Sequence, residues 1–197
     1  MINLGTSDPD WIFGLGNKFT WKGISINVLF DGRIGGKLVN GVEAKLYEGG
    51  THPATANSFR DDSYAGKATY VLDGVEVTDG TATWDQQGNI ISDTRNFKPN
   101  DKHVKYIDYL FDTYVNGIDQ SVLYDRSFVK LREITISFAL PDRLIKKLPF
   151  TDANFSIVGR NLALWSKVPF MDPDGYNYYS LAEPSYRNIG ININLKF

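Results

Sequence analysis

YRNIGININLKF, the run of residues 186–197, is the stretch that decides the fold. Apolar and polar side chains alternate along it almost without exception. The apolar positions are Ile189, Ile191, Ile193, Leu195 and Phe197, and the polar positions are Asn188, Gly190, Asn192, Asn194 and Lys196. Successive side chains of a β-strand point to opposite sides of the sheet. The run therefore predicts one strand with an apolar face and a polar face.

Residues 11–21 and 24–34 show the same alternation and predict an antiparallel hairpin. The apolar positions of the first segment are Trp11, Phe13, Leu15, Phe19 and Trp21, and those of the second are Ile24, Ile26, Val28 and Phe30. Leu29 is an exception to the pattern. Lys22 and Gly23, which separate the two segments, are typical of a tight hairpin turn.

Residues 127–140 and 154–165 are the third and fourth predicted strands. Ile134, Ile136, Phe138 and Leu140 share one face of the third strand. Val129 and Leu131 have the opposite parity. Either a β-bulge lies near Arg132, or, in a strand that crosses a membrane, that half of the strand lies outside the membrane. Pro141 ends the strand, and residues 142–147 predict one helical turn. The fourth strand has mixed parity, which leaves the orientation of its faces open.

The connections between these strands are short, very long, short and long. Turns at 22–23 and 141–153 alternate with the segments 36–126 and 166–185. Outer-membrane barrels have short periplasmic turns and long extracellular loops. A strand of about 12 residues spans ~40 Å at ~3.3 Å per residue, and a tilt of about 45° makes it cross ~28 Å, close to the apolar band. The pattern predicts an all-β fold, an antiparallel transmembrane β-barrel segment with a long extracellular insert at 36–126.

That insert has a different amino-acid composition from the strands. It is rich in Gly, Asp, Asn and Thr, with strand-like pieces at 68–72 and 74–77 and one helical pattern at 101–115. Its length exceeds the ~15 residues beyond which loops are usually structured or functional.

Composition excludes several classes of protein. The 197 residues carry 21 basic and 23 acidic side chains, a net charge of −2, so no basic field is available for nucleic acid. The absence of cysteine excludes disulfides, zinc-thiolate sites and cysteine nucleophiles.

The longest apolar run is about four residues, whereas a membrane helix needs about 20. Barrel strands, however, carry a much weaker hydropathy signal. The N-terminus lacks a signal peptide, so in an exported protein it has been removed or the chain begins within a longer one.

Two alternatives to the barrel stay open. A soluble β-sandwich strand also has one apolar face, so alternation alone does not exclude a carbohydrate-binding sandwich module. The uneven connections and the terminal Phe197 favour the barrel. A hydrolase is the least supported alternative, because Asp8, Asp10 and the pair Asp61-Asp62 lie among ordinary loop residues. We expect no enzyme and no catalytic residue.

Few motifs indicate a binding site. Asp172-Pro173-Asp174-Gly175 resembles part of a calcium loop but lacks the remaining carboxylates, so a turn is the better interpretation. His52 and His103 are too few for a metal cluster, and we expect no metal or cofactor. Tyr176, Tyr178 and Tyr179 are candidate contacts for cargo or for the membrane interface, since tyrosine serves both roles.

Several motifs resemble, in order, the late-barrel segment of SusC/RagA-type TonB-dependent transporters. They are LGTSDPDW at 4–11, GLGNKFTWKG at 14–23, LFDGRIGG at 29–36, SFVKLREITISFALP at 127–141, GRNL at 159–162, Pro169 with Asp172-Pro173-Asp174, and the ending 186–197. The resemblance covers nearly the whole chain except roughly residues 40–120. It implies that residues 1–197 are the C-terminal part of a receptor β-barrel.

The resemblance implies an outer-membrane barrel of about 22 strands with an N-terminal plug. This chain would supply about the last five strands, without the plug or the segment that engages TonB. The implied function is uptake of glycans or peptides, powered by TonB, in the bacterial outer membrane. The implied partners are the remainder of the barrel and plug, a SusD-like surface lipoprotein, TonB and outer-membrane lipid, with no nucleic acid.

Overall fold

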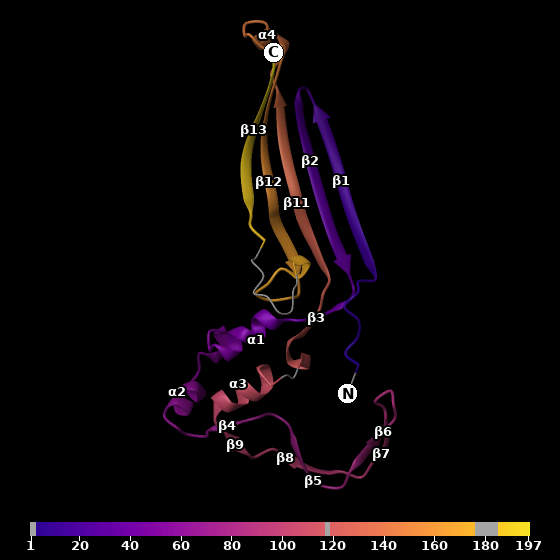
Figure 1. Ribbon diagram of the computed structural model, residues 1–197, viewed down its shortest axis with the longest axis vertical. Coiled ribbons are helices and arrows are strands. Elements are labelled where there is room, and N and C mark those ends of the chain that lie inside the picture. Colours follow the sequence, from indigo (N-terminus) through magenta and orange to yellow (C-terminus); the bar gives the residue numbers. More distant parts are fainter. Residues whose placement is uncertain (1–2, 117–118, 176–184) are drawn as a thin grey trace. The chain divides into compact units, whose positions relative to one another are not determined.

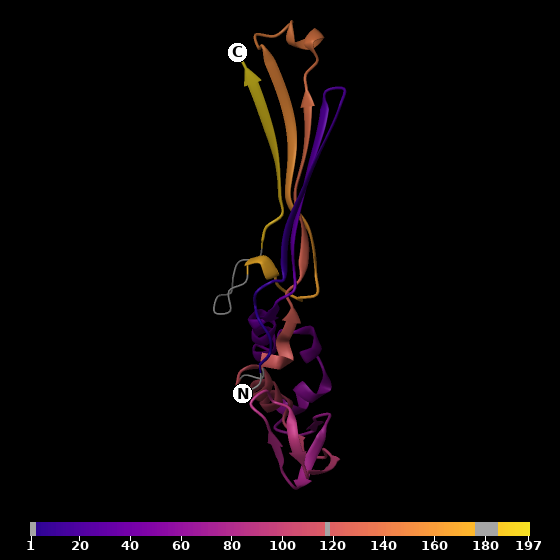
Figure 2. The ribbon, with the colours of Figure 1, turned by 90° about the vertical axis from the view of Figure 1, so that its right-hand side faces the viewer.

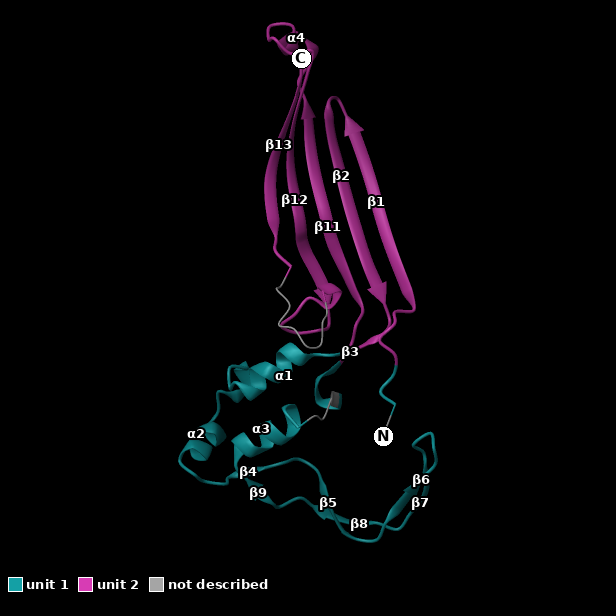
Figure 3. Cartoon of the chain, in the orientation of Figure 1, with its two compact units in different colours: residues 1–5, 39–123 teal, residues 6–38, 124–197 magenta. Residues whose placement is uncertain are grey.

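The computed structural model describes residues 3–116, 119–175 and 185–197. It divides into two compact units, which are coloured separately in Figure 3. Unit 1 comprises residues 1–5 and 39–123, and unit 2 comprises residues 6–38 and 124–197. Within the described residues, no helix has the length and apolar character that a membrane-spanning helix requires.

Unit 2 is built on one antiparallel sheet of five long strands (Figure 1). Their order is β1-β2-β11-β12-β13. The bounds are Trp11–Trp21 for β1, Ile24–Ile34 for β2, Phe128–Ala139 for β11, Asp152–Ser166 for β12 and Asn188–Lys196 for β13. The alternation predicted each strand to within about two residues. The order of the five strands in the sheet is therefore the same as their order along the chain.

Tight turns join the strands where the sequence predicts them. Lys22 and Gly23 both have positive φ, 46° and 84°, as a type I′ hairpin turn requires. Between β11 and β12 the predicted helical turn is present as α4 (Asp142–Ile145). Both short connections therefore confirm the hairpin arrangement.

A β-bulge at Arg132 explains the parity change in β11. The register against both neighbouring strands shifts between Leu131 and Glu133. As a result Leu131 lies opposite Phe30, and Ile134 lies opposite Val28. The two halves of β11 thus place their apolar side chains on the same face, which confirms the predicted bulge.

The register also settles the orientation of β12, which alternation left open. Phe155 lies opposite Phe138 and Ile193, and Ile157 lies opposite Ile136 and Ile191. Beyond the bulge, Trp165 lies opposite Val129. On β12 the register shift falls between Arg160 and Ala163, where Asn161 has a positive φ of 51°. One apolar face therefore continues across all five strands, with Asn17, opposite Val28, as a polar exception.

The apolar face is bare in the described part of the chain. Ile189, Ile191 and Ile193 expose 78%, 69% and 62% of their surface. Figure 2 shows the sheet turned by 90°, as a single curved layer. A β-sandwich would bury this row under a second sheet, and among the described residues nothing does so.

The opposite face carries rows of polar side chains that run across the strands. Ser25, Ser137, Ser156 and Asn192 are successive partners in one row. The hydroxyl oxygens of Ser137 and Ser156 lie 2.9 Å apart, and Thr20 Oγ1 lies 3.1 Å from Ser25 Oγ. The sheet therefore separates an apolar surface from a hydrogen-bonding one.

Unit 1 contains short helices and two-stranded ribbons. The helices are α1 (Gly41–Glu48), η1 (Pro53–Thr55), α2 (Ser58–Tyr64), α3 (Tyr106–Tyr114) and η2 (Asp119–Val122). The ribbons pair β4 (Tyr70–Val71) with β9 (His103–Val104), β5 (Val75–Asp79) with β8 (Asn96–Pro99), and β6 (Ala82–Trp84) with β7 (Ile90–Asp93). A further pair, β3 (Lys37–Val39) with β10 (Leu123–Asp125), consists mostly of unit 2 residues.

Of these helices, the sequence predicted α3 but missed α1 and α2. Each missed helix begins after an asparagine, Asn40 or Asn57, whose side chain accepts a hydrogen bond from the backbone three residues later. Tyr106 and Leu110 on α3 are buried against them. Burial, followed by the neighbouring tyrosines and Asp73, raises the pKa of Tyr70 in this cluster to about 12, so its ring is neutral at physiological pH.

Candidate functional site

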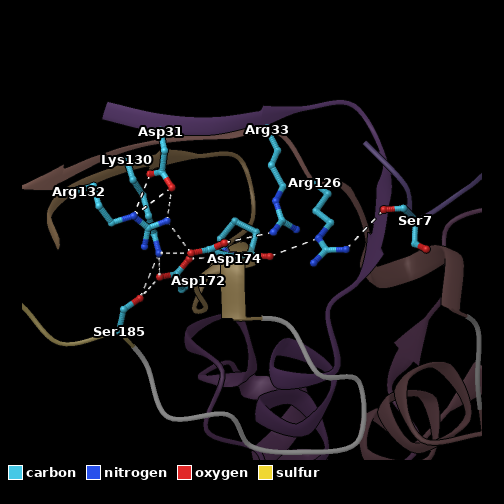
Figure 4. Close-up of polar contacts among 10 residues, drawn as sticks. Ser7, Asp31, Arg33, Arg126, Lys130, Arg132, Asp172, Asp174 and Ser185 are labelled. Carbon is cyan, nitrogen blue, oxygen red and sulfur yellow. Dashed lines mark hydrogen bonds and ion pairs between the residues drawn. The ribbon is translucent and has the colours of Figure 1, made fainter. Parts of the chain in front are cut away.

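A charged cluster lies on the polar face of the sheet, where β2 and β11 run into the loops (Figure 4). Its residues are Asp31 and Arg33 on β2, Lys130 and Arg132 on β11, Asp172 and Asp174 around η3 (Pro173–Gly175), together with Arg126 and Ser185. All of them belong to unit 2. The cluster joins the segment after β12 to the strands through ion pairs.

Lys130 is the centre of the cluster. Its side chain is almost fully buried, and its Nζ lies 2.5 Å from Asp172 Oδ2 and 3.2 Å from Asp174 Oδ2. Nζ also lies 3.4 Å from Ser185 Oγ. A buried ammonium group is costly unless carboxylates and hydrogen-bond acceptors surround it. Lys130 therefore depends on the η3 segment for its charge to be compensated.

Arg132 reaches the same group of carboxylates because it is two positions from Lys130 on β11, and alternation along a strand places both side chains on the polar face. The Arg132 Nε donates to both carboxylate oxygens of Asp31 at 3.0 Å, and its Nη2 donates to Asp31 and, at 2.9 Å, to Asp174 Oδ2. One guanidinium thus ties strand β2 to the η3 segment.

Two further arginines contact η3. Arg33 Nη2 lies 3.6 Å from Asp174 Oδ1, and Arg126 Nε donates to the Pro173 carbonyl at 3.3 Å. The Arg33 and Lys130 cations also lie 5.9 and 5.8 Å from the centre of the buried Phe128 ring, within the range of cation–π attraction. Four basic side chains therefore converge on one short turn.

The turn itself is the structure that the sequence favoured for residues 172–175. Asp172 Oδ1 accepts a hydrogen bond from the Asp174 backbone N–H at 3.0 Å. Burial acts to raise the pKa of Asp174, but hydrogen bonds from Arg132 and Lys130 outweigh it and hold that pKa below its usual range. The turn interpretation is confirmed, while the pairing of its carboxylates with strand cations could not be predicted from the motif.

Other residues singled out in the sequence do not join this cluster. Tyr176, Tyr178 and Tyr179, the candidate cargo contacts, lie outside the described residues. His52 caps η1, accepting from the Ala54 N–H at 3.1 Å, and His103 lies in β9. Asp62 accepts from the Thr69 hydroxyl at 2.9 Å. Among the described residues, no group of three acidic, histidine or cysteine side chains is arranged to hold a metal ion.

Comparison with known proteins adds sequence and fold relatives. No family model matches the chain. The chain is 22% identical over 188 residues, 95% of its length, to a protein of Formosa agariphila named TonB-dependent receptor P3. It also matches the RagAB peptide importer in its closed-closed state, with a TM-score of 0.60, 16% identity and 97% of the chain covered, and in its open-open state, with a TM-score of 0.54.

The match to the Formosa agariphila protein extends over 95% of the chain, which includes strands that carry the motifs named above. These similarities agree with the resemblance to SusC/RagA-type TonB-dependent transporters that the ordered motifs carry. The chain spans 15% of the length of the Formosa agariphila relative and 18% of the RagAB chain in the closed-closed state.

Acidification should release the η3 segment. A carboxyl group with a depressed folded-state pKa contributes stability above its unfolded pKa, about 3.9, and loses that contribution as the pH falls through the folded value. We expect the full-length receptor to melt at a higher temperature than an Asp174→Asn variant at neutral pH, and the difference to vanish in acid well below pH 4. Tryptophan fluorescence during heating at a series of pH values measures this.

Asp101→Asn is the matched control, because Asp101 is exposed and lies 3.4 Å from Lys98 in unit 1. Its melting temperature should follow that of the wild type at every pH. A difference between wild type and Asp174→Asn that stays constant down to the most acidic pH would contradict the role of the Asp174 carboxylate.

Proposed function

We propose that the five-stranded sheet is a section of the wall of a large outer-membrane barrel that imports nutrients. The apolar face lies against lipid and the polar face lines the lumen. The observation that carries this proposal is the apolar face itself, which continues through the bulge at Arg132 and across all five strands. A bulge that restores the face is expected where hydrocarbon must meet an unbroken apolar surface.

The finer features of the proposal come from the family. The barrel has about 22 strands, and the insert at 36–126 and the segment 166–185 lie outside the cell. Energy comes from TonB through a part of the receptor beyond this chain, and a SusD-like lipoprotein covers the outer face. Cargo is a glycan or a peptide. The RagAB structures, whose titles name a peptide importer, and the TonB-dependent receptor of Formosa agariphila support this assignment.

Adjacent residues of β13 test the two faces directly. The chain has no cysteine, so Ile191→Cys and Asn192→Cys can each carry a single spin label in this part of the full-length receptor, provided that cysteines elsewhere are removed. In liposomes, the label at 191 should be relaxed more by oxygen, which concentrates in lipid, than by a water-soluble nickel complex. The label at 192 should show less preference for oxygen.

The competing proposal, a soluble carbohydrate-binding sandwich, predicts a different accessibility for the label at 191. It requires the 191 label to be packed against protein and shielded from both reagents. A label at 191 without preference for oxygen would therefore overturn the barrel-wall proposal, whatever the receptor transports.

A further inference from the structure

A partly enclosed cavity of about 210 Å³ lies inside unit 1, between α1, α2 and α3. For comparison, an apolar cavity of about 150 Å³ is large enough to bind benzene. Aromatic and aliphatic side chains dominate its lining: Tyr47, Tyr64, Tyr106, Ile107, Leu110 and Phe111. The cavity therefore has room for an aromatic ring or a branched aliphatic group.

Some of the side chains that line the cavity are buried and form its base, and others are exposed and form its rim. Tyr106 and Leu110 at the base are 6% and 7% exposed, whereas Tyr64 and Phe111 at the rim are 72% and 52% exposed. Tyr47 is held between two rings, with centroids 4.0 Å from Tyr114 and 3.9 Å from His52. A pocket formed before its ligand arrives loses little ordering entropy on binding. An apolar group that enters it would cover the exposed rim.

Arg60 supplies a positive charge at this apolar pocket. Its Nη1 donates to the Gly50 carbonyl at 2.8 Å, and its guanidinium lies 5.8 Å from the centre of the Tyr64 ring. Within the described residues these contacts include no carboxylate. Glu48 also lines the pocket, but its Oε2 lies 2.5 Å from Lys45 Nζ. The guanidinium thus retains N–H groups suited to the paired hydrogen bonds of a carboxylate.

We propose that this pocket binds a ligand that joins an apolar group to a carboxylate. The apolar group lies among Tyr106, Leu110 and Phe111, and the carboxylate pairs with Arg60. A C-terminal peptide residue and a free aromatic or branched acid share this chemistry. A neutral sugar fits poorly, because sugars need several polar partners and the Ser63 hydroxyl already donates to the Phe59 carbonyl and accepts from the Tyr106 N–H.

This inference goes beyond the barrel-wall proposal. The pocket is internal to unit 1, so binding there does not require the strands of unit 2 to line a channel. Spin-label accessibility on β13 and ligand binding in unit 1 can therefore succeed or fail separately.

Calorimetry on the full-length receptor in detergent tests the pocket. The probes are the dipeptide Ala-Phe, its C-terminal amide and 3-phenylpropionate. We expect the acid forms to bind and the amide to bind about 10- to 100-fold more weakly, the usual worth of a hydrogen bond to a charged group. Binding of Ala-Phe alone identifies a peptide C-terminus as the ligand, while comparable binding of 3-phenylpropionate identifies the simple acid.

Two variants locate the binding. Arg60→Gln should weaken both acids by that factor and leave the amide unchanged, and Phe111→Ala at the exposed rim should weaken all probes that bind. Arg95→Gln is the control, because Arg95 is also in unit 1 but pairs with Asp93 at 2.7 Å. Absence of binding up to millimolar concentrations, or acid binding that Arg60→Gln and Phe111→Ala leave intact, would overturn the proposal.

Discussion

If the sheet is the barrel wall that we propose, replacing Ile191 with arginine in the full-length protein should lower its free energy of unfolding in the membrane by about 2–4 kcal/mol. Ile191 lies opposite Ile157 near the middle of β13, on the bare apolar face. An arginine at that depth must either leave hydrocarbon or draw water into it. Urea-dependent unfolding in liposomes, together with the amount of receptor inserted in outer membranes, measures the effect.

Asn192→Arg is the matched control, because the neighbouring residue points to the polar face and pairs with Ser156. We expect this variant to insert at nearly the wild-type level. Normal insertion and stability of Ile191→Arg, or equal losses for the two variants, would mean that hydrocarbon does not contact the row of isoleucines.

Lys130→Met should cost about 3–5 kcal/mol, the usual result of breaking a buried ion pair by removing one partner. Lys130 is 2% exposed, and the variant leaves Asp172 and Asp174 facing each other without the ammonium that separates their charges. Chemical unfolding of the receptor and protease sensitivity of the segment after β12 both report the loss.

A double-mutant cycle assigns this energy to the pair. Lys130→Met combined with Asp172→Asn should cost less than the two single variants together, because the second change removes the Asp172 carboxylate that loses its ion pair with Lys130. Arg160→Gln is the control: Arg160 pairs with Glu133 at 2.9 Å but is 64% exposed, so its loss should cost at most about 1 kcal/mol. Strict additivity in the cycle would show that Lys130 and Asp172 do not interact.

The strands were predictable because the alternation of apolar and polar side chains can be read from neighbouring residues alone. A side chain on a strand must face one of two sides, so Ile189, Ile191 and Ile193 reveal their common face without any knowledge of neighbours. The turn at Lys22 and Gly23 was predictable for a similar reason, since few residue pairs adopt positive φ at two successive positions.

The helices of unit 1 and the charged cluster were not predictable in the same way. Helices α1 and α2 are only eight and seven residues long, too short to be stable without tertiary contacts, and their apolar pattern is weak. Lys130 and Asp172 are 42 positions apart, and nothing local indicates that the turn at 172–175 returns to β11. The break in parity at Arg132 was the one available signal, and it pointed to a bulge rather than to a partner.

Alternation by itself established that this chain forms long strands with one apolar face, because a period of two leaves no other regular structure. It also limited the β11 anomaly to two explanations. Register decided between them, since only pairing with β2 and β12 shows that Val129 and Ile134 share a face. Long-range folding likewise brought Lys130 to Asp172 and Arg60 to an apolar pocket, because contacts between distant segments depend on how the chain closes and not on the residues beside them.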